Sequence, residues 1–280
     1  MDGADGGRCV KPPVFDYLRV DTVDEAVELL AKYGEDARVL AGGQSLLPML
    51  NMRLAQPRVL IDITRCAGLD RISAGGALDV GAAVTQAALE RRGTLQAESP
   101  LLARALPHIS HFQVRSRGTV CGSIAHAEPS AELPLVLAAL NGSVSLRSRK
   151  GRREIGADAF FTGMLATARR ADELVEAVRF PLIGQGERQG FAEFSLRHGD
   201  FAVVALAASV TSARIRLAVG GVDDRPRVVE WPRLSGSALD DGLNELAWSL
   251  DARNDPHASA RQRRQLVRRL GRDLIGGLCA

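Results

Sequence analysis

The stretch "RVLAGGQSLLPML", residues 38–50, places a short polar bend between two apolar runs. The first run has the composition of a short buried strand, and the adjacent glycines Gly42 and Gly43 end it. The second run can form a helix that begins near Ser45 and tolerates Pro48 in its first turn. We therefore expect a strand, a bend of exposed backbone and a helix.

Adjacent glycines at the end of a strand have two physical uses. They permit a positive φ, and they let a ligand approach bare backbone N–H groups. Successive N–H donors form a nest for an anion, and the N-terminus of a following helix adds the positive end of its dipole. A diphosphate would suit this arrangement, whereas a plain tight turn is the simpler interpretation of the same pattern.

A second segment, "GTVCGSIAHAEPSAELP" at residues 118–134, has a similar order of strand-like, small and helix-forming residues. A strand-like run reaches small residues between Thr119 and Ser123, and a helix is expected after Pro129. Two separated loops of this kind could hold one extended cofactor from both sides. The chain has neither a GK[ST] phosphate loop nor a GxGxxG fingerprint, so this cradle would differ from both.

Composition bounds the class of protein. The chain has 280 residues, 46% hydrophobic and 25% charged, enough for one large domain or two smaller ones. Its formal net charge of +3 is too small to indicate nucleic acid or an anionic membrane as a partner. No apolar run reaches the roughly 18–20 residues of a membrane span. The four cysteines are widely spaced, so we expect no disulfide framework or metal cluster, and a cytoplasmic location.

The pattern of strands and helices predicts an α+β protein. Thr22 and Glu25 form a capping box before the first amphipathic helix, and residues 142–156 have the pattern of a hairpin. After residue 190, three apolar runs suit an antiparallel meander, and helical segments close the chain. The expected parts are a flexible arm (1–10), a domain of two lobes (11–65 and 66–182), a linker (183–190) and a C-terminal domain of antiparallel sheet plus helices (191–280).

Three motifs carry a family resemblance. "AGGQSLLPMLNMRLAQPRVLIDI", "GTVCGSIAHAEPSAELP" and "RHGDFA" together resemble the FAD-binding medium subunit of molybdenum hydroxylases, the relatives of xanthine dehydrogenase and carbon-monoxide dehydrogenase. The match runs from about Pro12 to Ile275, which is nearly the whole chain. The resemblance implies a two-lobed FAD-binding domain of the para-cresol-methylhydroxylase type, and FAD as the cofactor.

The resemblance also implies which residues bind the cofactor. A first FAD loop around the diphosphate is expected at Val39, Leu40, Ala41, Gly42, Gly43, Gln44, Ser45 and Leu46. A second loop is expected at Thr119, Val120, Cys121, Gly122 and Ser123. Ile109 and Val175 match positions that pack against the cofactor, and the stretch from Phe191 to Asp200 matches a segment near the isoalloxazine ring.

Several positions depart from the family pattern. Cys121 stands where relatives commonly have a glycine, and a side chain there needs a negative φ or it crowds the diphosphate. Glu132 replaces the aspartate that usually binds the nucleotide portion of FAD, and Gln262 stands at a position where relatives often have tyrosine. No cysteine-rich insertion indicates an extra iron–sulfur cluster in this chain.

The remaining candidates for chemistry favour structural roles. His126 could lie beside the flavin or satisfy backbone groups in a turn, whereas His108 and His111 are expected to be structural or on the surface. His198 and Asp200 are expected to order a turn rather than to act as an acid–base pair. The arginine-rich C-terminal helix has one apolar stripe, which is typical of a solvated face or a subunit contact. No catalytic or metal-ligating residue is expected.

The function that the resemblance implies is electron transfer through FAD. A large partner subunit would hold molybdopterin and hydroxylate the substrate, and a small partner with two [2Fe–2S] clusters would pass electrons to this flavin. A dimer of such heterotrimers is the expected assembly. Two alternatives stay open: a non-redox nucleotide-binding or assembly protein that has lost flavin, and a stand-alone flavin oxidase.

Overall fold

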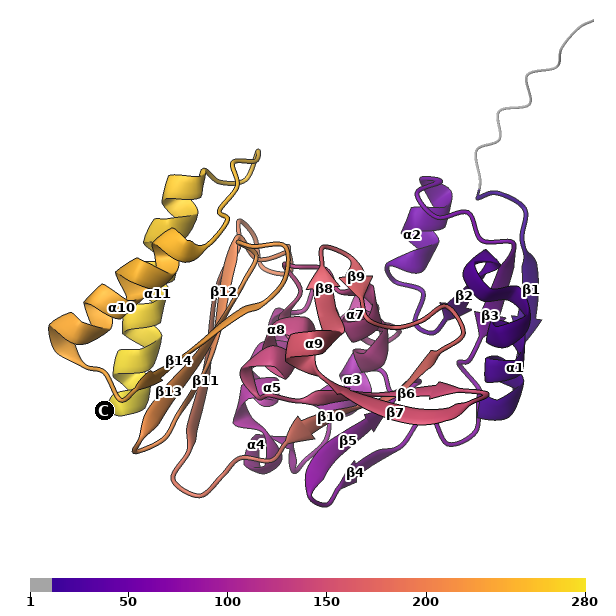
Figure 1. Ribbon diagram of the computed structural model, residues 1–280, viewed down its shortest axis with the longest axis horizontal. Helices are drawn as coiled ribbons and strands as arrows, with labels where there is room; N and C mark the ends of the chain where they lie inside the picture. The colour runs from indigo at the N-terminus through magenta and orange to yellow at the C-terminus, as the bar shows by residue number, and fades with distance from the viewer. Residues whose placement is uncertain (1–11) are drawn as a thin grey trace, which may run out of the picture.

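The structure is a computed structural model that describes residues 12–280, so the expected arm at residues 1–10 lies outside the described residues. The first lobe is a three-stranded parallel sheet in the order β1–β3–β2, with two helices beside it (Figure 1). Thr22 and Glu25 form the expected capping box at its first helix. The elements are β1 (Asp16–Arg19), α1 (Val23–Tyr33), the short η1 (Gly34–Asp36), β2 (Ala37–Leu40), α2 (Leu46–Asn51) and β3 (Val59–Asp62).

The second lobe is built on a five-stranded antiparallel sheet in the order β4–β5–β10–β6–β7. Its strands are β4 (Ile72–Ala74), β5 (Ala77–Gly81), β6 (Ser143–Ser148), β7 (Gly151–Gly156) and β10 (Leu174–Pro181), beside the small hairpin β8 (Phe161–Gly163) and β9 (Ala166–Thr167). Its helices are α3 (Gln86–Glu90), α4 (Leu95–Glu98), α5 (Pro100–Ala105), η2 (Leu106–His108), α6 (Phe112–Arg115), α7 (Val120–His126), α8 (Glu132–Ala139) and α9 (Ala157–Phe160).

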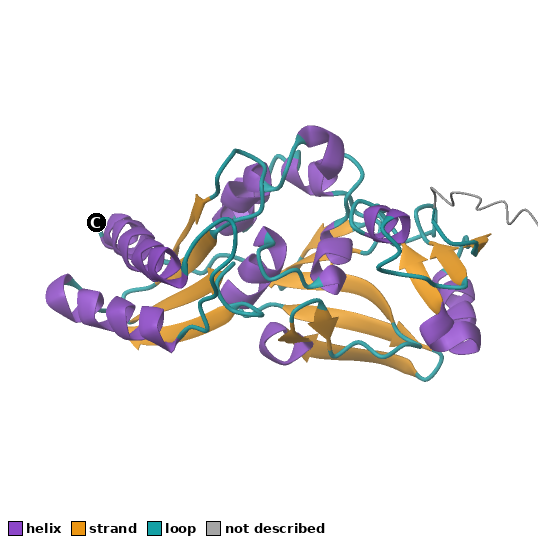
Figure 2. Cartoon of the chain, turned by 90° about the horizontal axis from the view of Figure 1, so that it is seen from above, coloured by secondary structure: helices purple, strands orange, loops and turns teal. Residues whose placement is uncertain are grey.

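The C-terminal part is a four-stranded antiparallel meander covered by two helices. Its elements are β11 (Arg188–Phe194), β12 (Val204–Val210), β13 (Arg214–Gly220), β14 (Arg227–Pro232), α10 (Gly236–Ser249) and α11 (Ala260–Cys279). The two helices lie on the outer face of the sheet, and the three large sheets follow one another along the molecule (Figure 2). Gln262, the departure from the family tyrosine, completes a capping box with Ser259 at the start of α11.

Helix α8 lies between the second lobe and the C-terminal sheet (Figure 1). All eight of its residues are buried, and its apolar side chains continue the core of the lobes onto strands β12 and β13. Arg216 of β13 donates from Nε to the carbonyl of Ala139 and from Nη2 to the carbonyl of Ala138, both at 3.0 Å. The bond to Ala139 satisfies a carbonyl that the end of a helix otherwise leaves without a partner, and the bond to Ala138 adds to the one that this carbonyl accepts from Asn141 N–H at 3.1 Å.

The connection between the lobes and the C-terminal sheet is shorter than the expected linker at 183–190. Strand β11 begins at Arg188, and the side chain of Gln189 is buried, with its Oε1 accepting a hydrogen bond from Leu101 N–H at 3.1 Å. A Cβ at Gly190 would lie 2.8 Å from Leu274 Cδ1 of α11. The end of this segment is therefore packed between α5 and α11. Within residues 12–280, no helix combines the length and apolar character that crossing a bilayer requires.

Candidate functional site

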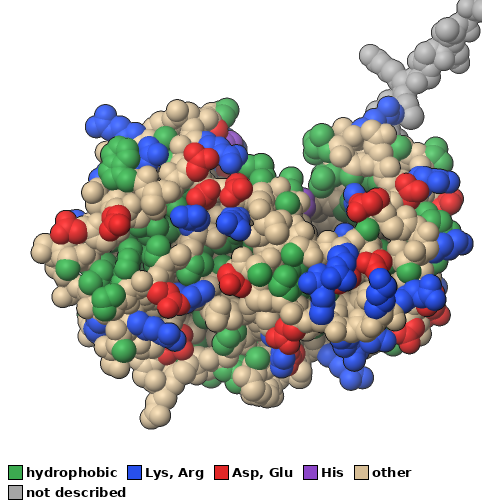
Figure 3. All heavy atoms as spheres, in the orientation of Figure 1, with side chains coloured by type: hydrophobic (Ala, Val, Ile, Leu, Met, Phe, Trp, Pro, Cys, Tyr) green, Lys and Arg blue, Asp and Glu red, His purple; other side chains and the backbone are tan. Residues whose placement is uncertain are grey.

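A cavity of about 910 Å³ lies between the first lobe, the second lobe and the loop that precedes β12. This volume is at the upper end of the range typical of small-molecule sites. The surface is hollowed beside α2, at the upper edge of the view in Figure 3. Its walls come from the bend after β2, the first turns of α7 and α8, the start of β10 and residues 199–201.

The glycine bend after β2 is pressed against the segment that precedes α7. A Cβ added to Gly42 would lie 2.2 Å from the carbonyl oxygen of Arg117 and 2.7 Å from Gly118 Cα. Gly43 has a φ of +71°, which L side chains rarely adopt. Both glycines are therefore required by the backbone, and two motifs about 75 residues apart in the sequence meet at this point.

The same bend exposes a row of backbone donors to the cavity. Among the hydrogen bonds within residues 12–280, none is donated by the N–H groups of Gly43, Gln44, Ser45 or Leu46. The Ser45 hydroxyl forms no capping bond to α2, so it too is available. Backbone N–H groups without partners at a cavity wall are suited to an anionic ligand.

The second motif differs from the loop that the sequence predicts. Residues 120–126 form helix α7, and Thr119 is its N-cap, with Oγ1 accepting from Gly122 N–H at 3.0 Å. The N–H of Val120 donates to the carbonyl of Val84 at 3.1 Å, and that of Ser123 to the carbonyl of Thr119. Most amides here are thus satisfied inside the protein. The second motif supplies a wall and a contact for Gly42 rather than a second row of free donors.

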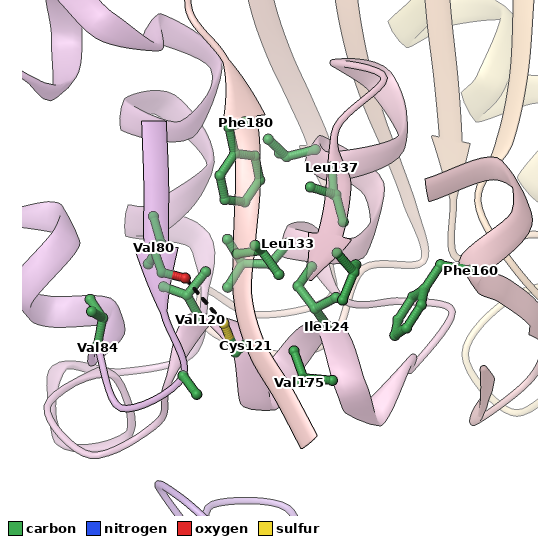
Figure 4. Close-up of a cluster of buried hydrophobic side chains, with 14 of the residues drawn as sticks. Val80, Val84, Val120, Cys121, Ile124, Leu133, Leu137, Phe160, Val175 and Phe180 are labelled. Carbon is green, nitrogen blue, oxygen red and sulfur yellow. Dashed lines mark hydrogen bonds between the residues drawn. The ribbon is translucent and has the colours of Figure 1, made fainter. Parts of the chain in front are cut away.

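The side chain of Cys121 faces the core instead of the ligand. It is 2% exposed, and its Sγ donates to the carbonyl of Val80 at 3.4 Å, among Ile124, Leu133 and Val175 (Figure 4). Burial raises the pKa of this thiol far above its usual value. Because residue 121 lies in a helix and its φ is not positive, the backbone condition that the sequence set for a side chain at this position is met.

Glu132 is the first residue of α8 and lines the cavity with a side chain that is almost wholly buried. Burial, with a smaller contribution from the charge of Glu193, raises the pKa of its carboxyl to about 8. His126 also lines the cavity, and burial lowers the pKa of its imidazole. Both groups are therefore largely neutral at pH 7 when no ligand is present.

Most of the residues that the sequence assigned to the cofactor lie at this cavity. The lining includes Val39, Ala41, Gly42, Gly43, Gln44, Ser45, Leu46, Ile109, Thr119, Cys121, Gly122, Ser123, His126, Glu132 and Val175. Three assigned residues are not part of the lining: Leu40, Val120 and Phe191. Leu40 packs beside Gly43 and Val120 is fully buried in the core. Phe191 packs on His108, with ring centroids 5.0 Å apart, and neither residue is part of the lining.

Several lining residues were missed by sequence reasoning. Gln86 is 5% exposed, and its Oε1 has no hydrogen-bond partner although it borders the cavity. Arg38 and Arg169 also line the cavity, each bonded to nearby carbonyls. Asp200 lies at the lining too; it ends the stretch that was expected near the isoalloxazine ring, and the residue itself was expected to order a turn. Gln86 and Arg169 come from segments without a recognisable motif, so no local pattern could have identified them, whereas Arg38 directly precedes the residues assigned to the first loop.

The cavity fits FAD on chemical grounds. Free amides in the Gly43–Leu46 bend suit a diphosphate, apolar residues such as Val39, Ile109 and Val175 suit flat rings, and the unpaired oxygen of Gln86 suits a ligand hydroxyl. Within residues 12–280, no group of three or more His, Cys, Asp or Glu side chains is placed to hold a metal ion.

Comparison with known proteins identifies the family. Residues 13–183 match the family described as the FAD binding domain in molybdopterin dehydrogenase, and the chain belongs to this family. The sequence is 39% identical to the nicotine 6-hydroxylase medium subunit of Paenarthrobacter nicotinovorans, over 95% of this chain and 98% of that one. It is 36% identical to subunit alpha of the 6-hydroxypseudooxynicotine dehydrogenase complex of the same organism, over 92% of each chain.

A solved structure gives the same result. The chain is similar to one in carbon monoxide dehydrogenase from Hydrogenophaga pseudoflava, with a TM-score of 0.91 and 30% identity over 96% of this chain and 98% of that one. The family, the fold class and the FAD cofactor predicted from the sequence are thereby confirmed, and the chain is an oxidoreductase subunit. The two alternatives, a protein that has lost flavin and a stand-alone oxidase, fit these findings less well.

Proposed function

We propose that this chain holds FAD in the cavity and passes electrons from [2Fe–2S] clusters of a small partner subunit to a terminal acceptor. A large partner with molybdopterin would hydroxylate the organic substrate. The observation that carries the proposal is the bend at Gly42 and Gly43. Its backbone packs closely against the carbonyl of Arg117, and the N–H groups of residues 43–46 beside it donate no hydrogen bond within the described chain. The medium and alpha subunit names of the relatives support a multi-subunit assembly.

The residues of this chain bind and orient the cofactor. The amides from Gly43 to Leu46 neutralise the diphosphate, and the Ser45 hydroxyl adds a further donor. Ile109 and Val175 exclude water from the ring systems. When bound, FAD supplies the redox chemistry itself, so no side-chain nucleophile is needed.

The assembly is proposed to be a dimer of heterotrimers located in the cytoplasm. Two of the three free cysteines in the described part of the chain, Cys66 and Cys121, are buried, which suits a reducing compartment. Copurification with a molybdenum-containing chain and an iron–sulfur chain tests the assembly. Isolation of the chain as a stable flavin oxidase that turns over alone would overturn it.

Gly42→Ala tests the site itself. Its Cβ would clash with the Arg117 carbonyl, so the bend must shift, and we expect FAD affinity to fall at least tenfold, or about 1.4 kcal/mol. Quenching of flavin fluorescence during titration of the FAD-free chain measures this. Gly76→Ala is the matched control, because Gly76 has open space around its Cα and no positive φ. Equal affinities of the two variants would place the diphosphate elsewhere.

A further inference from the structure

The two-residue turn between β8 and β9 contains a leucine in a left-handed conformation. Gly163 and Ala166 pair across the hairpin, so Met164 and Leu165 form the turn. Leu165 has a φ of +54°, whereas Met164 is not among the residues with a positive φ. A turn with this pattern favours glycine or asparagine at its second position, because larger L residues are disfavoured in the left-handed region. The backbone at Leu165 is therefore strained.

Backbone strain of this kind is concentrated around the cavity. In the described part of the chain, five non-glycine residues have a positive φ: Arg53, Ser110, Ala127, Asn141 and Leu165. Ser110 and Leu165 line the cavity, and Ala127 lies between two lining residues. Leu165 is the only one of the five with a large apolar side chain. Strained residues persist only where the surrounding structure holds them, and they gather at ligand sites.

Hydrogen bonds hold this turn at its tip and at its base. The Leu165 N–H donates to the carbonyl of Ala127, the left-handed C-cap of α7, at 3.1 Å. At the base of the hairpin, Arg225 Nη1 donates to the carbonyl of Phe161 at 3.1 Å. The hairpin thus lies beside α7 (Figure 1). Both bonds use only backbone atoms of the hairpin, so a glycine at position 165 would allow the same bonds without the strain.

Packing within the chain does not account for the leucine either. Leu165 lines the cavity and is 46% exposed, whereas Met164 beside it is 50% exposed and is not part of the lining. An apolar side chain stabilises a fold through the surface that it buries, and Leu165 leaves almost half of its surface exposed. The remaining apolar surface is available to a molecule that occupies the cavity.

We propose that the strained turn holds Leu165 as an apolar contact that covers bound FAD. The inference rests on the proposed function. In the FAD-free chain the unfavourable φ has no compensating contact, and the bound cofactor supplies one by burying the side chain. A leucine has no group that transfers electrons or protons, so its role is to bind the cofactor and to shield it from water.

The first test measures the accessibility of position 165 in the full chain. Leu165→Cys is made together with Cys9→Ser and Cys279→Ser, and Met164→Cys in the same background is the matched control. Cys66 and Cys121 are buried. Because a thiol reacts according to its exposure, saturating FAD should slow maleimide labelling about tenfold at position 165 and less than about twofold at position 164. Equal labelling rates at position 165 with and without bound FAD overturn the proposal.

The second test separates the contact from the strain. Leu165→Gly removes both, so the FAD-free chain should unfold at the same or a higher urea concentration, while FAD should bind about three- to tenfold more weakly. Leu165→Met keeps an apolar side chain of similar volume, and its FAD affinity should stay within about twofold of the wild type. Asn141→Gly is the control, because it relieves a positive φ at an exposed residue outside the cavity and should leave FAD affinity unchanged.

Fluorescence titration and urea unfolding of these variants decide between the outcomes. Unchanged FAD affinity in Leu165→Gly overturns the inference alone. A much lower urea midpoint of the FAD-free Leu165→Gly chain also overturns it, because the leucine would then stabilise the fold by itself. A wild-type chain that binds no FAD instead overturns the proposed function, and the inference with it.

Discussion

Cys121 shows how a departure from a family motif can be structurally neutral toward the ligand. The family glycine at this position indicates tight backbone packing, but here the side chain fills a core site near Val80. Thr119 caps the helix through its own hydroxyl, which accepts from Gly122 N–H and not from residue 121. The sequence did not predict the direction of the Cys121 side chain, because that direction depends on β5, some 40 residues earlier.

Cys121→Gly, the return to the family residue, should destabilise the chain without harming the site. The variant leaves a small cavity and adds a helix glycine, so we expect a loss of about 1–3 kcal/mol in the free energy of unfolding. Urea unfolding of the FAD-free chain measures it, with Cys279→Gly near the C-terminus as the control. FAD affinity should stay within about twofold; a tenfold gain would mean that Cys121 obstructs the ligand after all.

Gln86 illustrates a site residue that only the fold reveals. Its buried Oε1 has no hydrogen-bond partner, and a ligand hydroxyl could donate to it. Because Gln86→Leu removes this acceptor, the variant should bind FAD about tenfold more weakly. Because a buried polar group without a partner is unfavourable, the FAD-free variant should unfold at the same or a higher urea concentration. Fluorescence titration and urea unfolding of this variant and of the exposed Gln265→Leu give the comparison. Unchanged affinity would remove Gln86 from the binding site.

The carboxyl of Glu132 makes stability depend on pH. Its pKa is about 8 in the folded chain and close to the ordinary value of 4.5 when unfolded, so the folded state binds the additional proton between these values. Stability of the FAD-free chain should therefore fall as the pH rises from about 5 to 8, by on the order of 3 kcal/mol. Glu132→Gln should flatten this dependence in thermal unfolding curves. A wild type whose stability rises across this interval would contradict the burial of an unpaired acid.

At the scale of elements, local signals identified most of the fold. The Thr22 capping box, the hairpin of β6 and β7 and the meander from β11 to β14 follow from short-range patterns. Helix α7 does not, since the Val120 N–H pairs with Val84 and this long-range bond helps to fix where the helix starts. Small residues near its start have the composition of a loop, and the tertiary contact decides otherwise.

Helix α8 offers a test of how its end is held. Arg216 donates to two terminal carbonyls of this helix from two nitrogens of its guanidinium group. Lysine cannot reproduce this planar fork of donors, and alanine has no side-chain donor. Arg216→Ala should lower the free energy of unfolding by about 1–3 kcal/mol, and Arg216→Lys should restore only part of it. Arg214→Ala, two residues earlier and exposed, is the control for chemical denaturation. Equal midpoints for the two alanine variants would show that the bonds from Arg216 to α8 add no net stability.

At the scale of the whole molecule, the site is assembled from parts that are far apart in the chain. The bend of the first lobe was predictable, because adjacent glycines mark it in the sequence. Arg169 and Gln86 were not, because each reaches the cavity wall only through the tertiary fold. Family resemblance thus predicted the segments around Gly42 and Thr119 that meet at the cavity, while the rest of the wall required the three-dimensional structure.

Arg263 of α11 ties the C-terminal sheet to the loop at the cavity. Its Nη1 donates to the carbonyls of Val203 and Gly221, each at 2.6 Å, and it pairs with Asp255. Gly221 in turn donates to the carbonyl of Pro129, three residues before Glu132. The outer helix is thereby linked by hydrogen bonds both to the segment that follows Phe201 of the cavity lining and to the segment that precedes α8.

The burial of α8 on all sides constrains the design of hybrid subunits that join segments from two members of this family. This helix belongs by sequence to the flavin domain, yet it also packs against strands β12 and β13 of the C-terminal sheet. A chimera joined at the connection near residue 185 would pack α8 of one parent against β12 and β13 of the other. Hybrid subunits should therefore carry α8 and the meander from the same parent, even though the boundary in sequence lies about 45 residues further on.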